Sequence, residues 1–431
     1  MPIDIPDSEA HDVDALLTAD LLSALMRSTW TWDDRALRRD LSDLLVRVDA
    51  ANLIGAHDDI DDSIAAALHS QTRAVGSGFV ATVLGPKLIA DTGNPLRAQF
   101  LKLATDPAHF GKRAYAARKA VRAASDDYFV AHTEGVQYTP ESEWSALVAK
   151  EDVIGLGAAM RAYGNGLAAS NFFANKALAW QAVSAVRRDD TATAYADRIQ
   201  GDELTATLAA AEETGSWDPV LVKTRAELVD DGWTISGRKH YVPGADTADV
   251  VFVIARSTAG PSLFAVDAGS AGLDVTAHDV VDPTRPLFGI TFDNTPATLL
   301  GVEGSGGRLM STLIDRATTA LAAEQVGLIE AAITVLRDTA DRDDHRLAEV
   351  VLAHAGATAV WQRALMEPSP EAAAAAHIGC SGAAIAVTAA VAEMCDDDSR
   401  TNPLILRALS GSLLFGGPAL SHERLLDRLG I

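Results

Sequence analysis

The densest group of possible metal ligands in the sequence is an acidic run near residue 60. Asp58, Asp59 and Asp62 have the Asp-Asp-x-x-Asp spacing of magnesium–diphosphate sites. On a helix, Asp58, Asp61 and Asp62 share one face, and carboxylate oxygens are ligands that Mg²⁺ accepts. An acidic helix start, which the helix dipole favours, explains the same residues without a metal. We interpret the run as a helix start and predict no metal site.

The glycine, histidine and cysteine patterns argue against several other kinds of site. The glycine pairs at 155–157 and 164–166 are incomplete dinucleotide-binding fingerprints, because no strand pattern precedes them. None of the 11 histidines belongs to an HExxH zinc motif. The two cysteines, Cys380 and Cys395, are too few for a disulfide scaffold or a cysteine zinc site.

The charge balance limits the possible partners. The chain has 59 acidic and 36 basic residues, a net charge of −23, and such a surface repels nucleic-acid phosphates and anionic lipid. We therefore predict no nucleic-acid partner, and an anionic ligand needs a local basic pocket. The acidic N-terminus lacks the apolar core of a signal peptide. The uncharged segment 372–392 is mostly small residues, which favours a buried bundle helix over a membrane span. We expect a cytoplasmic protein without a membrane partner.

Three blocks of secondary structure must position any functional residue. Residues 1–200 are predicted to be helical, because apolar residues recur at three- and four-residue spacing, as at Leu41, Leu44, Leu45 and Val48. After Gly201 the pattern changes to short strands, with a β-hairpin at 226–236 and further strands near 250–255, 263–266, 273–276 and 287–292. Such strands are typical of a small barrel or sandwich.

The helical pattern returns after the glycine-rich run 301–307. The sequence therefore predicts an α+β fold with an N-terminal helical domain (1–200), a central β domain (201–303) and a C-terminal helical bundle (304–431). The two helical blocks are expected to pack together across the β insertion, because neither alone is obviously self-sufficient.

Four stretches, in their order and spacing, resemble the acyl-CoA dehydrogenase family. They are the loop 210–216, the hairpin and strand 231–243, the strand 248–256, and the helix that carries residues 315–316 and 322–327. The similarity is good from about residue 204 to 330, vague from 372 to 431 and thin over the first 200 residues. The runs 413–418 and 422–424 are similar to the chain end of actinobacterial members.

The resemblance implies an FAD cofactor and an acyl-CoA thioester substrate, oxidised between its α and β carbons. The loop residues Glu213, Thr214 and Ser216 and the strand residues Tyr241 and Val242 are the expected flavin contacts. In this family a carboxylate removes the α proton as general base, and the flavin accepts the β hydride.

The family positions for that base do not hold glutamate in this sequence. Ala390 falls where one loop of the C-terminal bundle supplies it, and the nearby Glu393 is one candidate. Other members place the base before an arginine on the first bundle helix. Asp315 and Arg316 resemble that pair but lie two residues early, which aligns Ala317 instead. Asp315 is the second candidate base, and Arg316 is a candidate substrate-binding residue.

The family's flavin-diphosphate residues are also missing. No Phe-Gly follows Gly327, and the segment 336–345 is short and acidic, although it contains Arg337 and Arg342. The sequence therefore resembles the subunit of actinobacterial heteromeric enzymes that has lost half of its flavin site. Its partner would be another chain of the family, in a hetero- or homo-oligomer that shares the FAD. The alternatives are a self-sufficient dehydrogenase, a non-catalytic structural partner and, more remotely, a flavin monooxygenase.

Overall fold

The computed structural model describes residues 16–56, 61–90, 93, 96–105, 112–133, 138–230, 232–339 and 344–431. The chain forms two compact units, one from the segments 1–128, 345–360 and 422–431, and the other from 129–344 and 361–421. Asp58 and Asp59 of the acidic run lie outside the described residues. Asp61, which the structure does describe, caps the helix that begins at Asp62, because its carboxylate accepts a hydrogen bond from the Ser63 amide at 2.7 Å. The Ser63 side chain, and then its amide, lower the Asp61 pKa by hydrogen bonding.

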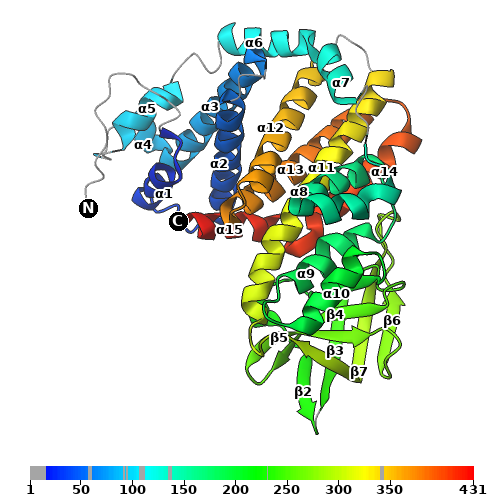
Figure 1. Cartoon of the computed structure of the whole chain (residues 1–431). Helices are drawn as coiled ribbons and strands as arrows, with labels where there is room; N and C mark the ends of the chain where they lie inside the picture. The colour runs from blue at the N-terminus through cyan, green and yellow to red at the C-terminus, as the bar shows by residue number, and fades with distance from the viewer. Residues whose placement is uncertain are drawn as a thin grey trace. The chain divides into compact units, whose positions relative to one another are not determined.

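The first unit is helical (Figure 1). Its helices are α1 (Ala19–Ser28), α2 (Arg35–Gly55), α3 (Asp62–Leu84), α4 (Pro86–Ile89), α5 (Arg97–Thr105) and α6 (Lys112–Ala123). Three more helices, α7 (Ser125–Thr133), α12 (Arg346–Met366) and α15 (Gly417–Leu429), contribute residues to both units.

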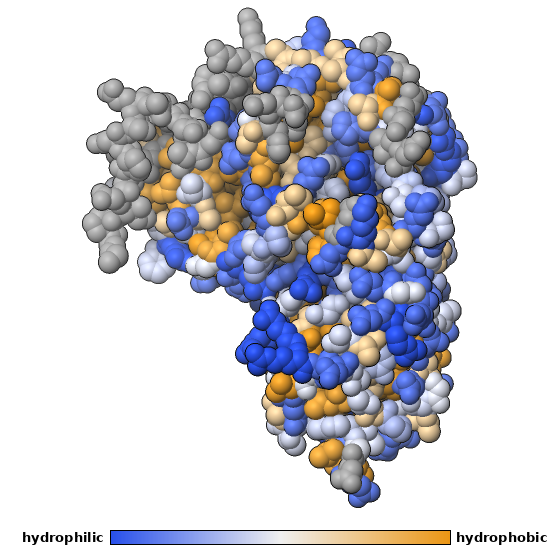
Figure 2. All heavy atoms as spheres, viewed as in Figure 1, coloured by the Kyte–Doolittle hydropathy of each residue, from blue (hydrophilic) through white to orange (hydrophobic). Residues whose placement is uncertain are grey.

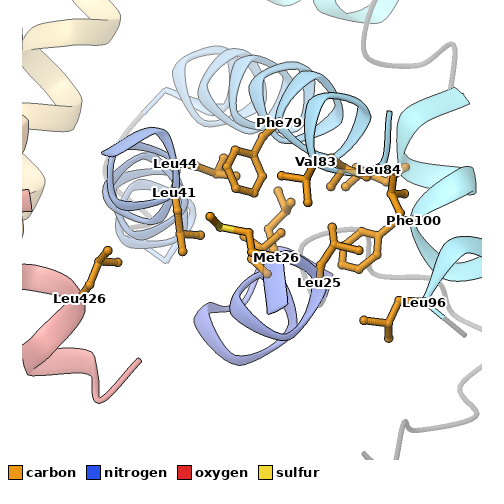
Figure 3. Close-up of a cluster of buried hydrophobic side chains, with 14 residues drawn as sticks. Leu25, Met26, Leu41, Leu44, Phe79, Val83, Leu84, Leu96, Phe100 and Leu426 are labelled. Atoms are coloured by element: carbon orange, nitrogen blue, oxygen red, sulfur yellow. The ribbon is translucent and has the colours of Figure 1, made fainter. Parts of the chain in front are cut away.

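The core of the first unit follows from the apolar spacing of its helices. Side chains from α1, α2, α3 and α5 meet in one cluster, which includes Leu25, Leu41, Phe79, Phe100 and, from α15, Leu426 (Figure 3). Each of them is at most 6% exposed. Burial of such side chains contributes about 1.5–3 kcal/mol each, so α15 is held to this unit by the same apolar core.

The second unit begins with helices that lead into a β domain. They are α8 (Trp144–Asn165), the π-helix η4 (Phe173–Trp180), α9 (Gln181–Ser184) and α10 (Asp190–Gln200), with the short 3₁₀ turns η3 (Glu141–Glu143) and η5 (Pro219–Leu221). After the β domain come α11 (Gly306–Thr339), α13 (Pro370–Met394), α14 (Asp398–Leu413) and the turn η6 (Leu414–Gly416). The predicted order of helices, strands and helices is confirmed.

Seven strands form a small closed barrel. They are β1 (Ala206–Ala209), β2 (Arg225–Val229), β3 (Gly232–Pro243), β4 (Val250–Ser257), β5 (Gly260–Asp267), β6 (Leu273–Ala277) and β7 (Leu287–Leu300). The order is β1-β4-β2-β3-β7-β5, and a further β4–β5 pairing closes the ring, while β6 pairs with β7. Of these pairings, β1–β4 and β2–β4 are parallel. Closure leaves few open strand edges.

Alternating side chains fill the barrel interior. Ile235, Val251, Val253, Phe264 and Ile290 are at most 1% exposed and form its core. The predicted hairpin is confirmed, because β2 pairs with β3 in antiparallel register. On β2, just before the hairpin turn, Leu228 and Val229 are 60% and 51% exposed, and Figure 2 shows some hydrophobic surface at that end of the barrel.

The helices α8 and α11 cross at glycines. A Cβ added at Gly164 would lie 2.0 Å from the carbonyl oxygen of Glu324, and one added at Gly327 would lie 1.9 Å from that of Arg161. Each backbone therefore touches the other directly, as only glycine allows. A helix of the first sequence block thus packs on a helix of the last block, as the sequence predicts.

The apolar helix α13 packs against α11 inside the second unit. By length and composition alone, three segments are apolar enough to cross a membrane: Gly306–Asp338, Pro370–Met394 and Asp398–Leu429. In the fold, 89% of the most apolar window of the first segment and 56% of that of the second are buried. In these first two segments, more than half of the apolar window is thus buried inside the fold.

Candidate functional site

A cleft of about 410 Å³ lies in the second unit beside the barrel. Its walls come from the π-helix η4, the loop after β1, the end of β3, the loop between β6 and β7, and the end of α14 with the turn η6. Most lining side chains are apolar or aromatic, and a few are polar. This size and composition are typical of small-molecule and cofactor sites.

A β-bulge directs Tyr241 into the cleft. The pairing of β3 with β7 shifts register between Lys239 and Val242, so His240 and Tyr241 form the bulge. Tyr241 has a φ of 58°, which is uncommon for a residue with a side chain. Its ring is a wall of the cleft, and its hydroxyl donates to the carbonyl oxygen of Glu213 at 3.1 Å. Bulges commonly re-aim side chains next to functional sites.

Hydrogen bonds of the Glu212 carboxylate fix the loop after β1. One carboxylate oxygen accepts from the amides of Lys223 and Thr224, each at 2.8 Å, and from the Lys239 ammonium at 3.1 Å. Lys239 also donates to the carbonyl of Ala210 at 2.9 Å. Burial lowers the pKa of Lys239 to about 8, against the opposing charge of Glu212. Burial would raise the Glu212 pKa, but these donors lower it on balance.

The structure brings together only some of the expected flavin contacts. Thr214 and Tyr241 both line the cleft. Glu213 contributes its carbonyl oxygen to Tyr241, and Ser216 accepts from the amide of Asp218 at 3.1 Å; neither lines the cleft. Val242 is 1% exposed, belongs to the barrel core and is not among the residues that line the cleft. The bulge turns Tyr241 outward while Val242 remains inside.

Two histidines lie at the same cleft. His240 and His278 stack with ring centroids 5.5 Å apart and an interplanar angle of 17°. Burial, and then the nearby His240, lower the pKa of His278. His240 is therefore a cleft residue that packs on a second histidine, which the sequence did not reveal.

The loop between β6 and β7 carries the charged residues that sequence reasoning missed. Asp282 accepts from the amide and hydroxyl of Thr284 at 3.0 and 2.6 Å, and from the Ser410 hydroxyl at 2.6 Å. Burial would raise the Asp282 pKa, but these donors and the charges of Arg407 and Arg285 lower it on balance. The only sequence signal was a polar run, Asp282 to Arg285, between two strands.

Asp282 should make stability depend on pH. Because its folded pKa is lowered, the stabilisation is complete above the unfolded pKa and is lost as pH falls through the folded value. We expect Asp282→Asn to lower the free energy of unfolding by about 1.5–3 kcal/mol at neutral pH, as for hydrogen bonds to charged groups, and by less in acid. Urea unfolding at both pH values checks this.

The matched control for that measurement is Asp279→Asn, which changes an exposed carboxylate of the same loop. It should leave the free energy of unfolding nearly unchanged. If the free energy of unfolding changes with pH equally in the wild type and in Asp282→Asn, the charge of Asp282 does not stabilise the fold.

A buried charge network supports the cleft floor. Glu324 of α11 is fully buried and binds Arg285 and Arg407 through one carboxylate oxygen, with Arg407 Nε at 2.7 Å. Arg407 also donates to the carbonyl and hydroxyl oxygens of Thr284 at 2.9 and 2.8 Å. Burial alone would lower the Arg407 pKa, but Glu324 raises it above its usual value. The network ties the β6–β7 loop to α11 and α14.

The candidate bases lie elsewhere. Asp315 and Arg316 line a second cavity of about 190 Å³, together with Gln181 and largely apolar residues of α8, α11, α12 and α13. Glu393 is exposed near the end of α13 and lines neither cavity. Among the described residues, the carboxylates that line the cleft are Asp279 and Asp282. Neither predicted base is therefore at the cleft.

The cleft fits the ring of a flavin better than its diphosphate. Tyr241 and Trp217 offer flat aromatic walls, and Trp217 is itself fixed edge-on against Phe415 at 5.0 Å. Cationic side chains and helix N-termini are common binding groups for a diphosphate, whereas Arg285 alone supplies a guanidinium among the described lining residues. Arg337 donates instead to Thr133 at 3.0 Å. Arg342 lies outside the described residues.

Comparison with known proteins places this geometry in context. Residues 207–295 match the model of the acyl-CoA dehydrogenase middle domain. A curated relative, cyclohex-1-ene-1-carbonyl-CoA dehydrogenase from Geobacter metallireducens, is 32% identical over 161 residues, which is 34% of this chain and 42% of the relative. The chain thus matches less than half of that protein's length.

Solved structures share the fold over a greater length. The ChsE4–ChsE5 complex from Mycobacterium tuberculosis superposes with a TM-score of 0.57 at 17% identity, covering 73% of this chain and 97% of the other. The Tcur3481–Tcur3483 steroid ACAD superposes with a TM-score of 0.57 at 20% identity, covering 73% and 98%. At these identities the similarity concerns the fold.

Proposed function

The chain belongs to the acyl-CoA dehydrogenase family, and from this premise we propose that it is a flavoprotein subunit for the α,β-dehydrogenation of acyl-CoA thioesters. We place it in a cytoplasmic oligomer with a second chain of the family, acting in lipid or steroid side-chain catabolism. The observation that carries the proposal is the cleft at Thr214 and Tyr241, which has flat walls and a buried cation but neither candidate base.

Each wall of the cleft has a part in holding the cofactor. The aromatic faces of Tyr241 and Trp217 would pack on a flat ring and exclude water from it. The loop at 210–216 supplies backbone groups on a support that Glu212 and Lys239 hold rigid. Arg285 gives the inner wall a positive charge. FAD, when bound, accepts the hydride from the β carbon of the substrate.

The missing base is the reason for proposing a partner. Asp282 already accepts three hydrogen bonds and has a lowered pKa, so it is a poor acceptor for the weakly acidic α proton. The cleft also offers a single guanidinium for a diphosphate. A second subunit that supplies a base and phosphate-binding residues completes the site. The ChsE4–ChsE5 complex is a precedent for two different chains in one assembly on this fold.

A self-sufficient dehydrogenase is the second candidate. The 190 Å³ cavity favours it, because Asp315 and Arg316 lie together there among apolar side chains. In that case Asp315 is the base and Arg316 contacts the substrate.

The purified chain alone should not dehydrogenate acyl-CoA. A positioned general base contributes about 10²–10⁴-fold to such a reaction, and we expect at least that deficit until a base-containing partner is added. The assay combines the chain, FAD, a panel of acyl-CoA esters and an artificial electron acceptor. Absorbance of the purified chain reports whether flavin is retained.

Two outcomes decide between the candidates. Turnover that needs both chains supports the shared site. Turnover by this chain alone, abolished by Asp315→Asn or by Glu393→Gln, contradicts it and identifies the base. Glu367→Gln, which changes an exposed carboxylate directly after α12 that lines neither cavity, is the control for either variant.

A further inference from the structure

Two buried side chains beneath the cleft have hydrogen-bond donors without acceptors. Arg285 is 3% exposed; its Nη2 binds Glu324, but Nε and Nη1 have no partner in the described part of the chain. Gln325 is fully buried, and neither atom of its amide has a partner there. Unmet donors of this kind cost about 1–3 kcal/mol each, and more when charged. An acceptor atom supplied by a bound ligand would remove this cost.

The unpaired donors meet over Gly411. A Cβ placed on that residue would lie 2.1 Å from Gln325 Nε2 and 3.6 Å from Arg285 Nη1. Both nitrogens therefore approach one small region at the Cα of Gly411, where the Gln325 amide packs so closely on the backbone that only glycine allows the contact. The preceding residue, Ser410, and Arg285 itself line the 410 Å³ cleft. The region is thus at the inner wall of the cleft.

The surroundings hold the guanidinium in place but leave two of its nitrogens without a hydrogen-bond partner in the described part of the chain. Arg285 lies over the ring of Phe173 with its Cζ 4.9 Å from the centroid. The oxygen of Glu324 that it contacts is shared with Arg407, so one carboxylate oxygen serves two guanidiniums. An anionic or strongly polarised oxygen is the natural complement to such an arrangement.

We propose that Arg285 and Gln325 form an acceptor-binding site at the inner wall of the cleft, which binds a negatively polarised oxygen of the ligand. A ring carbonyl of a flavin and the thioester carbonyl of an acyl-CoA both provide this chemistry. The existence of the site is independent of the proposed function; only the identity of the ligand rests on it.

The first test uses acetate as a minimal oxygen ligand for the full chain. Melting temperature is measured in sodium acetate and in sodium chloride at equal ionic strength. A ligand that binds only the folded state raises the melting temperature, so acetate should raise it for the wild type and not for Arg285→Met or Gln325→Leu. Arg256→Met is the control, because Arg256 binds backbone carbonyls of the segment 219–222, before β2, and lies outside the cleft lining.

A second variant covers the case in which Arg285→Met does not fold. Gly411→Ala keeps both side chains but displaces the Gln325 amide, so it should abolish the acetate effect. Gly382→Ala, where a Cβ meets nothing within 4 Å, is its control and should show the same acetate-dependent shift in melting temperature as the wild type. If acetate shifts the wild type no more than chloride does, or shifts all variants equally, the site does not exist.

The second test identifies the source of the oxygen. Dissociation constants for FAD and for butyryl-CoA are measured separately by tryptophan fluorescence. Loss of a charged hydrogen bond of about 1.5–3 kcal/mol corresponds to about 10–100-fold weaker binding. We expect that loss in Arg285→Met for one of the two ligands. Wild-type binding of neither ligand contradicts the proposed function while leaving the acetate result intact, and unchanged binding of both ligands overturns the assignment to them.

Discussion

Glu324→Gln should destabilise the protein by about 3–5 kcal/mol, the cost of removing one partner from a buried ion pair. The substitution keeps the size of the side chain and removes its charge. Arg407 is fully buried and Arg285 is 3% exposed, so both guanidiniums would remain in the interior without their shared anion. The loss should appear as a lower midpoint in urea unfolding, with little change in its slope.

The control for this measurement is Glu349→Gln. Glu349 is 46% exposed and pairs with Arg118 at 3.0 Å on the surface, where ion pairs contribute about 0–1 kcal/mol. If Glu324→Gln proves no more destabilising than Glu349→Gln, the buried network contributes nothing to stability. The cleft would then have to be held by apolar packing alone.

Gly327→Ala is expected to produce the other large loss. Its Cβ would lie 1.9 Å from the carbonyl oxygen of Arg161, and a backbone atom cannot rotate away as a side chain can. The helices α8 and α11 would have to separate, so we expect a loss at or above the upper end of the about 1–3 kcal/mol range for overpacking. Thermal unfolding of the full chain measures it.

Gly382→Ala is expected to change the stability in the opposite direction. It lies on α13, where a Cβ meets nothing within 4 Å, so alanine should stabilise the helix by about 0.5–1 kcal/mol. A melting temperature for Gly327→Ala that equals or exceeds that of the wild type would contradict the close crossing of α8 and α11.

The barrel could be predicted because its signals are local. Alternation around Trp233 and the turn after Val229 identify the hairpin, and the structure pairs Val229 with Gly232. A register shift has no such signal, because one extra residue exchanges the two faces of a strand without changing its composition. The sequence therefore places Val242 beside Tyr241 at the cleft, whereas the structure places its side chain in the barrel core.

The charged part of the site depends on distant residues and could not be predicted. Arg285 binds Glu324, which lies 39 positions away in the sequence. Arg407 binds the same carboxylate from 83 positions away. None of these residues belongs to a short motif, and in a chain with a net charge of −23 a single buried glutamate does not stand out. Only the fold shows that this glutamate is surrounded by guanidiniums.

The glycine crossing of α8 and α11 also sets an expected order of folding. The side-chain amide of Asn165 donates to the carbonyl oxygen of Gly327, which lies 162 positions away in the sequence. All strands of the barrel lie between these two residues in the chain. Closing such a long loop has a higher entropic cost than pairing neighbouring strands. The barrel strands should therefore gain protection from hydrogen exchange before the α8–α11 contact does. The crossing then acts as the final closure, which joins two distant parts of the chain around a domain that is already formed.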